Sequence, residues 1–246
     1  MHMFHDALVS FAERRVIYME KHAEEKNELE YNQLEVAKQI LLSEPLEIGV
    51  DVMDIAMDQL YEVLHGVPVL GLTVKALKTI TSVRDAFFTK KVLTFTQSIH
   101  NHESDNEKWE KHRKKLLKNS KLQVKEVETL LICLERHKDY EKSKILGRFY
   151  RSYYLEKIDW TGFQILAEVL DDISILDFSE LQNLYKKISY KKDDTYNILA
   201  MKRLNRCGLA DYYNGMLVSK EDTDEMYSAK ITEFGKIFCE MAFDEF

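Results

Sequence analysis

The sequence predicts a mainly α-helical protein that ends in a small mixed α/β region. Among its 246 residues are only 8 glycines and 2 prolines, the residues that interrupt helices most strongly. Apolar residues recur at spacings of three and four along much of the first 206 residues, as on the buried face of a helix. Near the C-terminus, the segments LADYYNG and YSAKI have the composition of strands.

Composition limits the classes of protein that need consideration. With 45% hydrophobic and 31% charged residues, the chain can build a core and is not disordered. A net charge of −7 gives no general attraction to nucleic acid. The three cysteines, Cys133, Cys207 and Cys239, are far apart and indicate a reducing environment. We expect a cytoplasmic protein, with peripheral attachment to a membrane left open, because the uncharged run at 63–74 is too short to span a bilayer.

The first predicted domain, residues 1–156, is a multi-helix bundle. Phe4, Leu8 and Phe11 fall on one helical face, and a second apolar series near residues 34–41 ends before Pro45. Further helices are predicted around 127–134 and 145–155.

An unusually apolar helical hairpin is predicted within this bundle at residues 46–99. The turn falls at residues 65–68, His-Gly-Val-Pro, between helices near 46–64 and 69–84. A third helix follows, with Phe88, Val92, Phe95 and Ile99 on one face. Helices this apolar need other helices, a partner or lipid around them. We therefore predict an interaction surface whose charged residues are Asp51, Asp54, Asp58, Lys75, Lys78, Arg84 and Asp85.

A basic stretch follows at residues 108–125, where eight basic residues accompany one acid, Glu110. Such a stretch is usually the solvated face of a helix, but it can also hold anionic lipid or nucleic acid. The residues that would make this contact are Lys111, Arg113, Lys114, Lys115 and Lys118, with Trp109 as an anchor.

The second predicted domain, residues 157–246, has helices near 161–172, 177–187 and 193–207. Asp177 or Ser179 is expected to cap the second of these helices, and Gly208 to end the third. A strand, a loop, a second strand and a helix capped by Thr232 follow. This order resembles winged-helix modules. In such a module the third helix enters DNA by its N-terminus. Here that end is Asp193-Asp194, and the wing carries Glu221, Asp222, Asp224 and Glu225. We therefore do not expect sequence-specific DNA binding.

No motif for catalysis is recognised in the sequence. It has no glycine-rich phosphate loop, no G-x-S-x-G, no H-E-x-x-H and no cysteine cluster. The nearest approach to a metal site is His100, His102, Glu103 and His112, which we interpret as a polar helix end. We predict a protein that is not an enzyme, with no catalytic residues, no metal and no cofactor.

The segment VPVLGLTVKALKTITSVRDAFFTKKVLTF, with the basic region and the winged-helix-like end, resembles the Abi-alpha family of bacterial abortive-infection proteins over about residues 46–240. The similar features are Val67-Pro68, the apolar residues 69–83, Arg84-Asp85 and Lys90-Lys91. This resemblance implies a non-enzymatic role in phage defence, as effector or accessory subunit, through protein contacts, homo-oligomers or a membrane surface. Two alternatives remain: a winged-helix regulator that binds nucleic acid, and an interaction subunit of an unrelated multi-protein complex.

Overall fold

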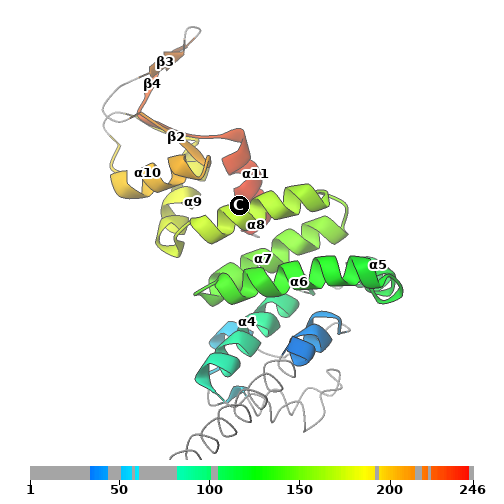
Figure 1. The fold of residues 1–246 in the computed structure, drawn as a ribbon. Coiled ribbons are helices and arrows are strands. Elements are labelled where there is room, and N and C mark those ends of the chain that lie inside the picture. The colour runs from blue at the N-terminus through cyan, green and yellow to red at the C-terminus, as the bar shows by residue number, and fades with distance from the viewer. Residues whose placement is uncertain are drawn as a thin grey trace, which may run out of the picture.

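The computed structural model describes residues 34–43, 51–56, 59–60, 82–100, 105–191, 194–213, 218–220 and 223–243 (Figure 1). Over these residues the chain is mainly helical, with a small three-stranded sheet near the C-terminus, which confirms the predicted mainly α class. Residues 34–41 are helical. The long helices that follow are α4 (Val83–Ile99), α5 (Asn106–Lys118), α6 (Ser120–Arg136), α7 (Tyr140–Tyr154) and α8 (Trp160–Asp172).

Helix α4 is the third helix that the apolar spacing predicts. It begins with a capping box in which Ser82 and Asp85 each accept a hydrogen bond from the other's backbone N–H. Val92, Phe95 and Ile99 have no exposed surface, so the predicted apolar face is the buried face.

Helices α4 and α7 cross very closely, and a glycine makes this possible. A Cβ atom on Gly147 of α7 would lie 2.6 Å from the carbonyl oxygen of Phe95 and 2.9 Å from Cβ of Ser98. Only a residue without a side chain fits at this crossing.

Helices α5 and α6 are separated by one residue, Asn119. Its side chain accepts a hydrogen bond from the backbone N–H of Leu122 and so caps α6. Helix α8 packs on both α6 and α7 (Figure 1).

The first arm of the predicted hairpin is not a continuous helix. Residues Val52–Asp54 form a single 3-10 turn, η1, with extended backbone at Asp51 and Ile55 on either side. The side chain of Asp51 accepts a hydrogen bond from the N–H of Met53 at 2.9 Å, a local bond that favours a turn over a helix interior. The predicted turn at 65–68 and the helix at 69–81 lie outside the described residues.

The C-terminal region contains short helices and an antiparallel sheet. Its elements are η4 (Ile175–Asp177), α9 (Phe178–Lys187), β1 (Ser189–Tyr190), α10 (Ile198–Arg206), β2 (Ala210–Tyr212), β3 (Val218–Lys220), β4 (Thr223–Tyr227), β5 (Ala229–Ile231) and α11 (Glu233–Ala242). Strand β5 lies between β1 and β2 and is antiparallel to both. Strands β3 and β4 pair with each other, away from the helices (Figure 1).

Most of the helix and strand predictions for this region are confirmed. Thr232 caps α11 by accepting a hydrogen bond from the N–H of Gly235 at 2.8 Å. Gly208 follows α10 with a φ of 73°, as expected for a glycine that ends a helix.

The start of α10 was predicted incorrectly. The helix begins at Ile198, because Asn197 accepts hydrogen bonds from the N–H groups of Leu199 and Ala200. Asp194 instead accepts from the N–H of Lys191 and is not the N-terminus of this helix, and Asp193 lies outside the described residues.

The cap of α9 also differs from the prediction that Asp177 or Ser179 would provide it. Asp177 occupies the N-cap position, but its side chain makes no capping hydrogen bond. Its carboxylate is held by Arg203 of α10 at 2.5 and 2.6 Å, an ion pair that replaces the cap.

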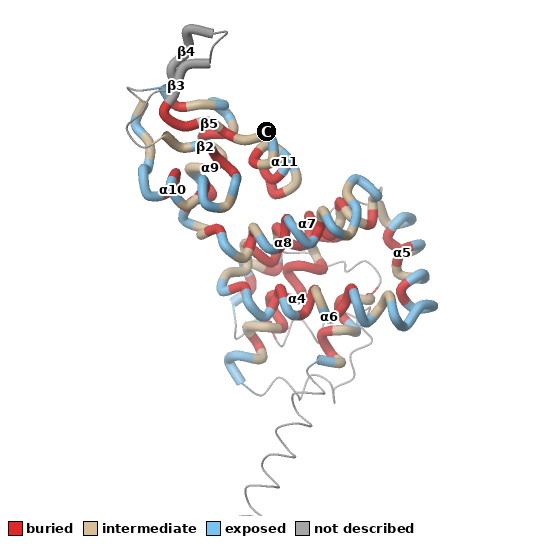
Figure 2. Tube along the Cα trace, turned by 45° about the horizontal axis from the view of Figure 1, so that its top comes forward, coloured by how far each residue is buried: buried red, intermediate tan, exposed pale blue. Residues whose placement is uncertain are grey.

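One apolar core passes through both predicted domains (Figure 2). The rings of Phe149 in α7 and Phe238 in α11 have centroids 5.2 Å apart. Arg148 donates a hydrogen bond to the carbonyl of Ala242. The predicted boundary at 156/157 stays a prediction, and helices from both of its sides pack directly on each other.

Candidate functional site: a cleft between α4 and α6

A cleft of about 750 Å³ lies between the start of α4 and the end of α6. The two helices pack side by side (Figure 2). The residues that line the cleft are Leu34, Arg84, Asp85, Phe87, Phe88, Lys91, Leu131, Ile132, Glu135, Arg136, His137 and Lys138.

The floor of the cleft is apolar and partly open to solvent. Phe87 and Phe88 come from α4, and Phe87 packs against Tyr140 with ring centroids 4.7 Å apart. Ile132 comes from α6 and is 51% exposed. Burying such side chains removes apolar surface from water, so the floor favours an apolar ligand or segment.

The rim of the cleft is charged. Arg84 and Glu135 form an ion pair of 2.9 Å between the two helices, with both side chains largely in solvent. Asp85 is occupied by the capping box of α4. On the α6 side, Lys138 adds an exposed positive charge, and the exposed Arg136 is paired with Asp171 of α8 at 3.6 Å.

Lys91 fixes the base of the cleft. Its buried ammonium group donates to the carbonyl oxygens of Leu134, Glu135 and His137, which are the free acceptors at the end of α6. Burial lowers the pKa of Lys91, and the nearby carboxylate of Glu135 opposes this shift. The contact ties the end of α6 to α4, so the cleft is built on a rigid frame.

Lys90, its neighbour, holds the η1 turn. Its ammonium donates to the carbonyl oxygens of Met53 at 2.9 Å and Ile55 at 2.6 Å, and lies 4.5 Å from the ring centroid of Tyr140. Burial lowers the pKa of Lys90, against the opposing charges of Asp54 and Asp51.

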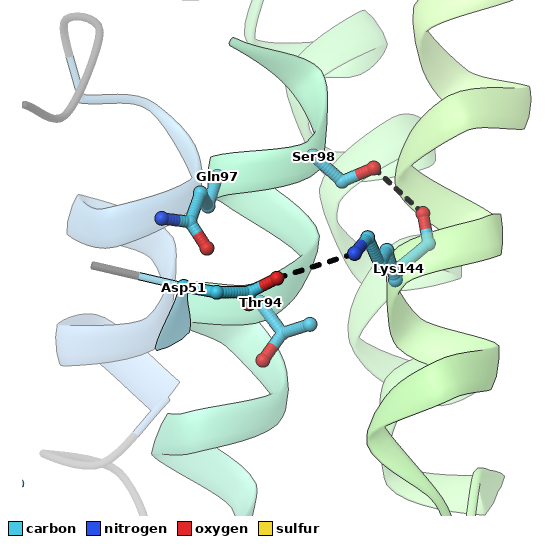
Figure 3. Close-up of a pocket in the computed structure, with 5 residues that line it drawn as sticks. All are labelled: Asp51, Thr94, Gln97, Ser98 and Lys144. Carbon is cyan, nitrogen blue, oxygen red and sulfur yellow. Dashed lines mark hydrogen bonds and ion pairs between the residues drawn. The ribbon is translucent and has the colours of Figure 1, made fainter. Parts of the chain in front are cut away.

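The structure separates the charged residues that the hairpin prediction grouped together. Asp51 lines a second, smaller cavity of about 200 Å³ with Thr94, Gln97, Ser98 and Lys144 (Figure 3). There its carboxylate forms an ion pair of 3.2 Å with Lys144. Arg84 and Asp85 lie more than two turns away along α4, at the cleft. Asp54 is the last residue of η1 and is exposed, whereas Asp58, Lys75 and Lys78 lie outside the described residues.

The basic stretch is divided between solvent and core. Lys111, Lys114, Lys115 and Lys118 are exposed on α5. Arg113 instead binds Glu110 at 2.8 Å and the carbonyl of Leu42 at 3.3 Å.

Trp109 cannot act as the surface anchor that the sequence suggested. It is fully buried, and its indole N–H donates to the carbonyl of Ser43 at 3.3 Å. It is a core residue because it shares the inner face of α5 with His112 and Leu116.

A buried polar cluster, which the sequence interpretation missed, joins α5, α6 and α7. The carboxylate of Glu126 accepts hydrogen bonds from Tyr150 at 2.7 Å and Tyr153 at 2.8 Å, and lies 3.0 Å from Nε2 of His112. Burial alone would raise the pKa of Glu126, but these partners outweigh burial and lower it. The sequence did contain a signal for this cluster, because Glu126 is an acid on the apolar face of its helix, directly before Val127.

The cluster holds helices together and lines neither of the two cavities described above. Both oxygens of Glu126 are already occupied by side chains of the chain itself, so we assign the cluster a structural role.

The histidines suggested for a metal site lie in different surroundings. His100 ends α4 and packs against Trp109 with ring centroids 5.2 Å apart; burial lowers its pKa to about 4. His102 and Glu103 lie outside the described residues. Among the described side chains, no three His, Cys, Asp or Glu residues gather as metal ligands would.

None of the helices in the described ranges combines the length and the apolar character needed to cross a bilayer.

Comparison with known proteins gives no relative: no family model, no curated protein and no solved structure matches this chain.

Proposed function

We propose that this protein is a non-enzymatic interaction protein of the antiphage-defence type, which binds a protein partner in the cleft between α4 and α6. The observation that carries the proposal is the apolar floor of the cleft, partly in solvent between charged rims. A concave apolar surface with a charged border is typical of sites that receive the apolar face of a helix.

The charges at the rim indicate the kind of partner. Arg84 and Glu135 neutralise each other, and Asp85 is held by the capping box. Lys138 remains as a positive charge in the same lining as the exposed side chain of Ile132, whereas Arg136 is paired with Asp171 of α8 at 3.6 Å. An amphipathic helix with acidic residues beside its apolar face would complement this surface.

The test uses two isoleucines with similar exposure. Ile132 in the cleft is 51% exposed, and Ile165 on α8, away from the cleft, is 47% exposed. We expect Ile132→Glu and Ile165→Glu each to change the unfolding free energy by less than about 1 kcal/mol. Bacteria that express the protein are challenged with phage, and plaques are counted. The unaltered protein and Ile165→Glu should reduce plaque numbers, whereas Ile132→Glu should not.

The sign of the charge gives a second comparison. Both variants at position 132 should protect less than the unaltered protein. If the partner is acidic, Ile132→Lys should retain more protection than Ile132→Glu. A folded Ile132→Glu protein with full protection would rule out the cleft. Absence of protection by the unaltered protein would rule out the defence role.

A second candidate function is nucleic-acid binding by a winged-helix-like module at residues 157–243. It is favoured by the sheet order β1-β5-β2 and by the start of α10, which lacks the acids expected there. Against it, Ile198 and Leu199 are more than half exposed at that helix start, and such side chains suit protein contact. We expect gel shifts at physiological salt to show weak binding without sequence preference. Salt-resistant, sequence-dependent binding would favour the regulator instead.

A further inference from the structure

The outer face of α5 and the start of α6 carries a dense set of lysines. The buried side of α5 consists of Trp109, His112 and Leu116, so the opposite side faces solvent (Figure 2). Seven lysines of this stretch are exposed: Lys108, Lys111, Lys114, Lys115, Lys118, Lys121 and Lys125.

The local charge is opposite to that of the whole molecule. Residues 108–125 contain eight basic residues and one acid, a local charge of +7 in a chain whose net charge is −7. The one acid, Glu110, is paired with Arg113 at 2.8 Å and with Lys114 at 3.3 Å. The lysine face therefore attracts anions although the protein as a whole repels them.

Two apolar side chains stand in solvent among these lysines. Leu117 is 52% exposed and Val124 is 51% exposed. Leu117 follows Lys114 by one helical turn, and Val124 follows Lys121 by one turn. A ligand that offers both phosphate groups and hydrocarbon would bind the lysines and the two apolar side chains together.

We propose that this lysine face binds an anionic lipid bilayer. The lysines would contact headgroup phosphates, and Leu117 and Val124 would enter the interface between headgroups and acyl chains. Nucleic acid also supplies phosphates, but its backbone gives Leu117 and Val124 no hydrocarbon to enter. This inference goes beyond the proposed protein partner and uses a different surface from the cleft.

The face is held in a fixed shape by the core. His112 of α5 lies 3.0 Å from the carboxylate of Glu126 in α6, and Asp105 before α5 is paired with Arg151 of α7. No large rearrangement is needed before contact, so the cost of ordering the surface is small.

The main experiment measures sedimentation of the full chain with vesicles. One set contains equal parts of phosphatidylglycerol and phosphatidylcholine, and the other contains phosphatidylcholine alone. We expect binding to the first set only, weakening as salt is raised. Lys111→Gln, Lys115→Gln and Lys118→Gln together should lower the partition coefficient about 100-fold, since each lysine near an anionic surface adds roughly the same increment.

The matched control removes three exposed lysines elsewhere: Lys157→Gln, Lys191→Gln and Lys202→Gln. It has the same net charge as the test variant and should keep its binding. Circular dichroism checks that both variants are folded, and the salt dependence of the unaltered protein is a test that needs no variant.

The apolar residues separate a bilayer from nucleic acid. Leu117→Ser with Val124→Ser should weaken vesicle binding severalfold. Equal binding to neutral vesicles, or unchanged binding by the triple lysine variant, would overturn the proposal. So would a single-stranded oligonucleotide that binds the lysine face more tightly than the vesicles do and is unaffected by the two serines.

Discussion

Glu126 links three helices of the bundle through the contacts of its carboxylate. A carboxylate with no exposed surface is unfavourable unless its charge is matched by hydrogen bonds. Here Tyr150, Tyr153 and His112 surround it, and they come from the two helices that flank α6. Their geometry converts an unfavourable buried charge into a link between three helices.

We predict that Glu126→Gln lowers the unfolding free energy at neutral pH by about 2 kcal/mol, because hydrogen bonds to a charged group are lost. The folded-state pKa of Glu126 is lowered, so its contribution is present above the unfolded pKa of about 4.3 and lost as pH falls through the folded value. Urea unfolding of both proteins should therefore give a constant difference from pH 7 to about 5, and a smaller one below about pH 4.

The control for this prediction is Glu128→Gln, an exposed acid on the same helix. It should change the unfolding free energy by less than about 0.5 kcal/mol. Equal losses in the two variants would show that the hydrogen bonds of Glu126 contribute nothing specific.

Single residues also show where sequence patterns lose information. Helical spacing identifies an inner and an outer face, so Lys111 and Lys118 could be placed in solvent. It does not identify a side chain's partner, and the binding of Arg113 to the carbonyl of Leu42 could not be predicted. Nor does any pattern indicate that Ile188, a β-branched residue, has a φ of 70° between α9 and β1.

Among the elements, the crossing of α4 and α7 places a strict requirement on one residue of α7. The backbone of Phe95 leaves no room for a side chain at position 147. Close-packed helices respond poorly to added volume because their neighbours cannot move without disturbing other contacts.

We predict that Gly147→Ala destabilises the protein by about 2 kcal/mol, although alanine is the better helix former. Gly162→Ala in α8 is the matched control. Its Cβ would meet nothing closer than Asp159 Oδ1 at 3.3 Å, so its effect should be within about 1 kcal/mol of zero. Thermal unfolding followed by circular dichroism compares the two. A Gly147→Ala protein as stable as the control would mean that the helices separate at little cost.

The elements with strong periodicity or a recognised cap were predictable, whereas η1 and the start of α10 were not. Apolar spacing located α4, and Thr232 and Gly208 located the start of α11 and the end of α10. The turn at η1 and the start of α10 depend on the side chains of Asp51 and Asn197. Each of these side-chain hydrogen bonds affects only a few residues, so neither produces a repeating pattern of apolar residues in the sequence. The cleft was not predicted as a cleft, since its walls come from segments about 50 residues apart.

At the scale of the whole molecule, the contact between α7 and α11 joins the two predicted domains. The rings of Phe149 and Phe238 meet edge to face in the continuous core, and neither residue has exposed surface. A substitution on one side of this contact should therefore lower the stability of both regions.

We predict that Phe238→Ala lowers the unfolding free energy by about 3 to 5 kcal/mol, because a large buried ring leaves a cavity. Unfolding should remain a single transition, measured together by near-ultraviolet and far-ultraviolet circular dichroism. Phe234→Ala, a partly buried neighbour in the same helix, should cost less. Two separate transitions in the Phe238→Ala protein would show that the two regions unfold independently.

Helix α6 carries parts of both proposed surfaces, Val124 at one end and Ile132 towards the other. Eight residues of helix correspond to about 12 Å, less than half the thickness of a bilayer's hydrocarbon layer. If the lysine face rests on a membrane, the mouth of the cleft therefore lies close to the lipid headgroups. A partner attached to the same membrane would then reach the cleft by lateral diffusion more readily than a partner in bulk solution. Recruitment to the cleft would therefore depend on the partner's concentration per unit area of membrane, and a soluble fragment of that partner would bind less often at the same total amount.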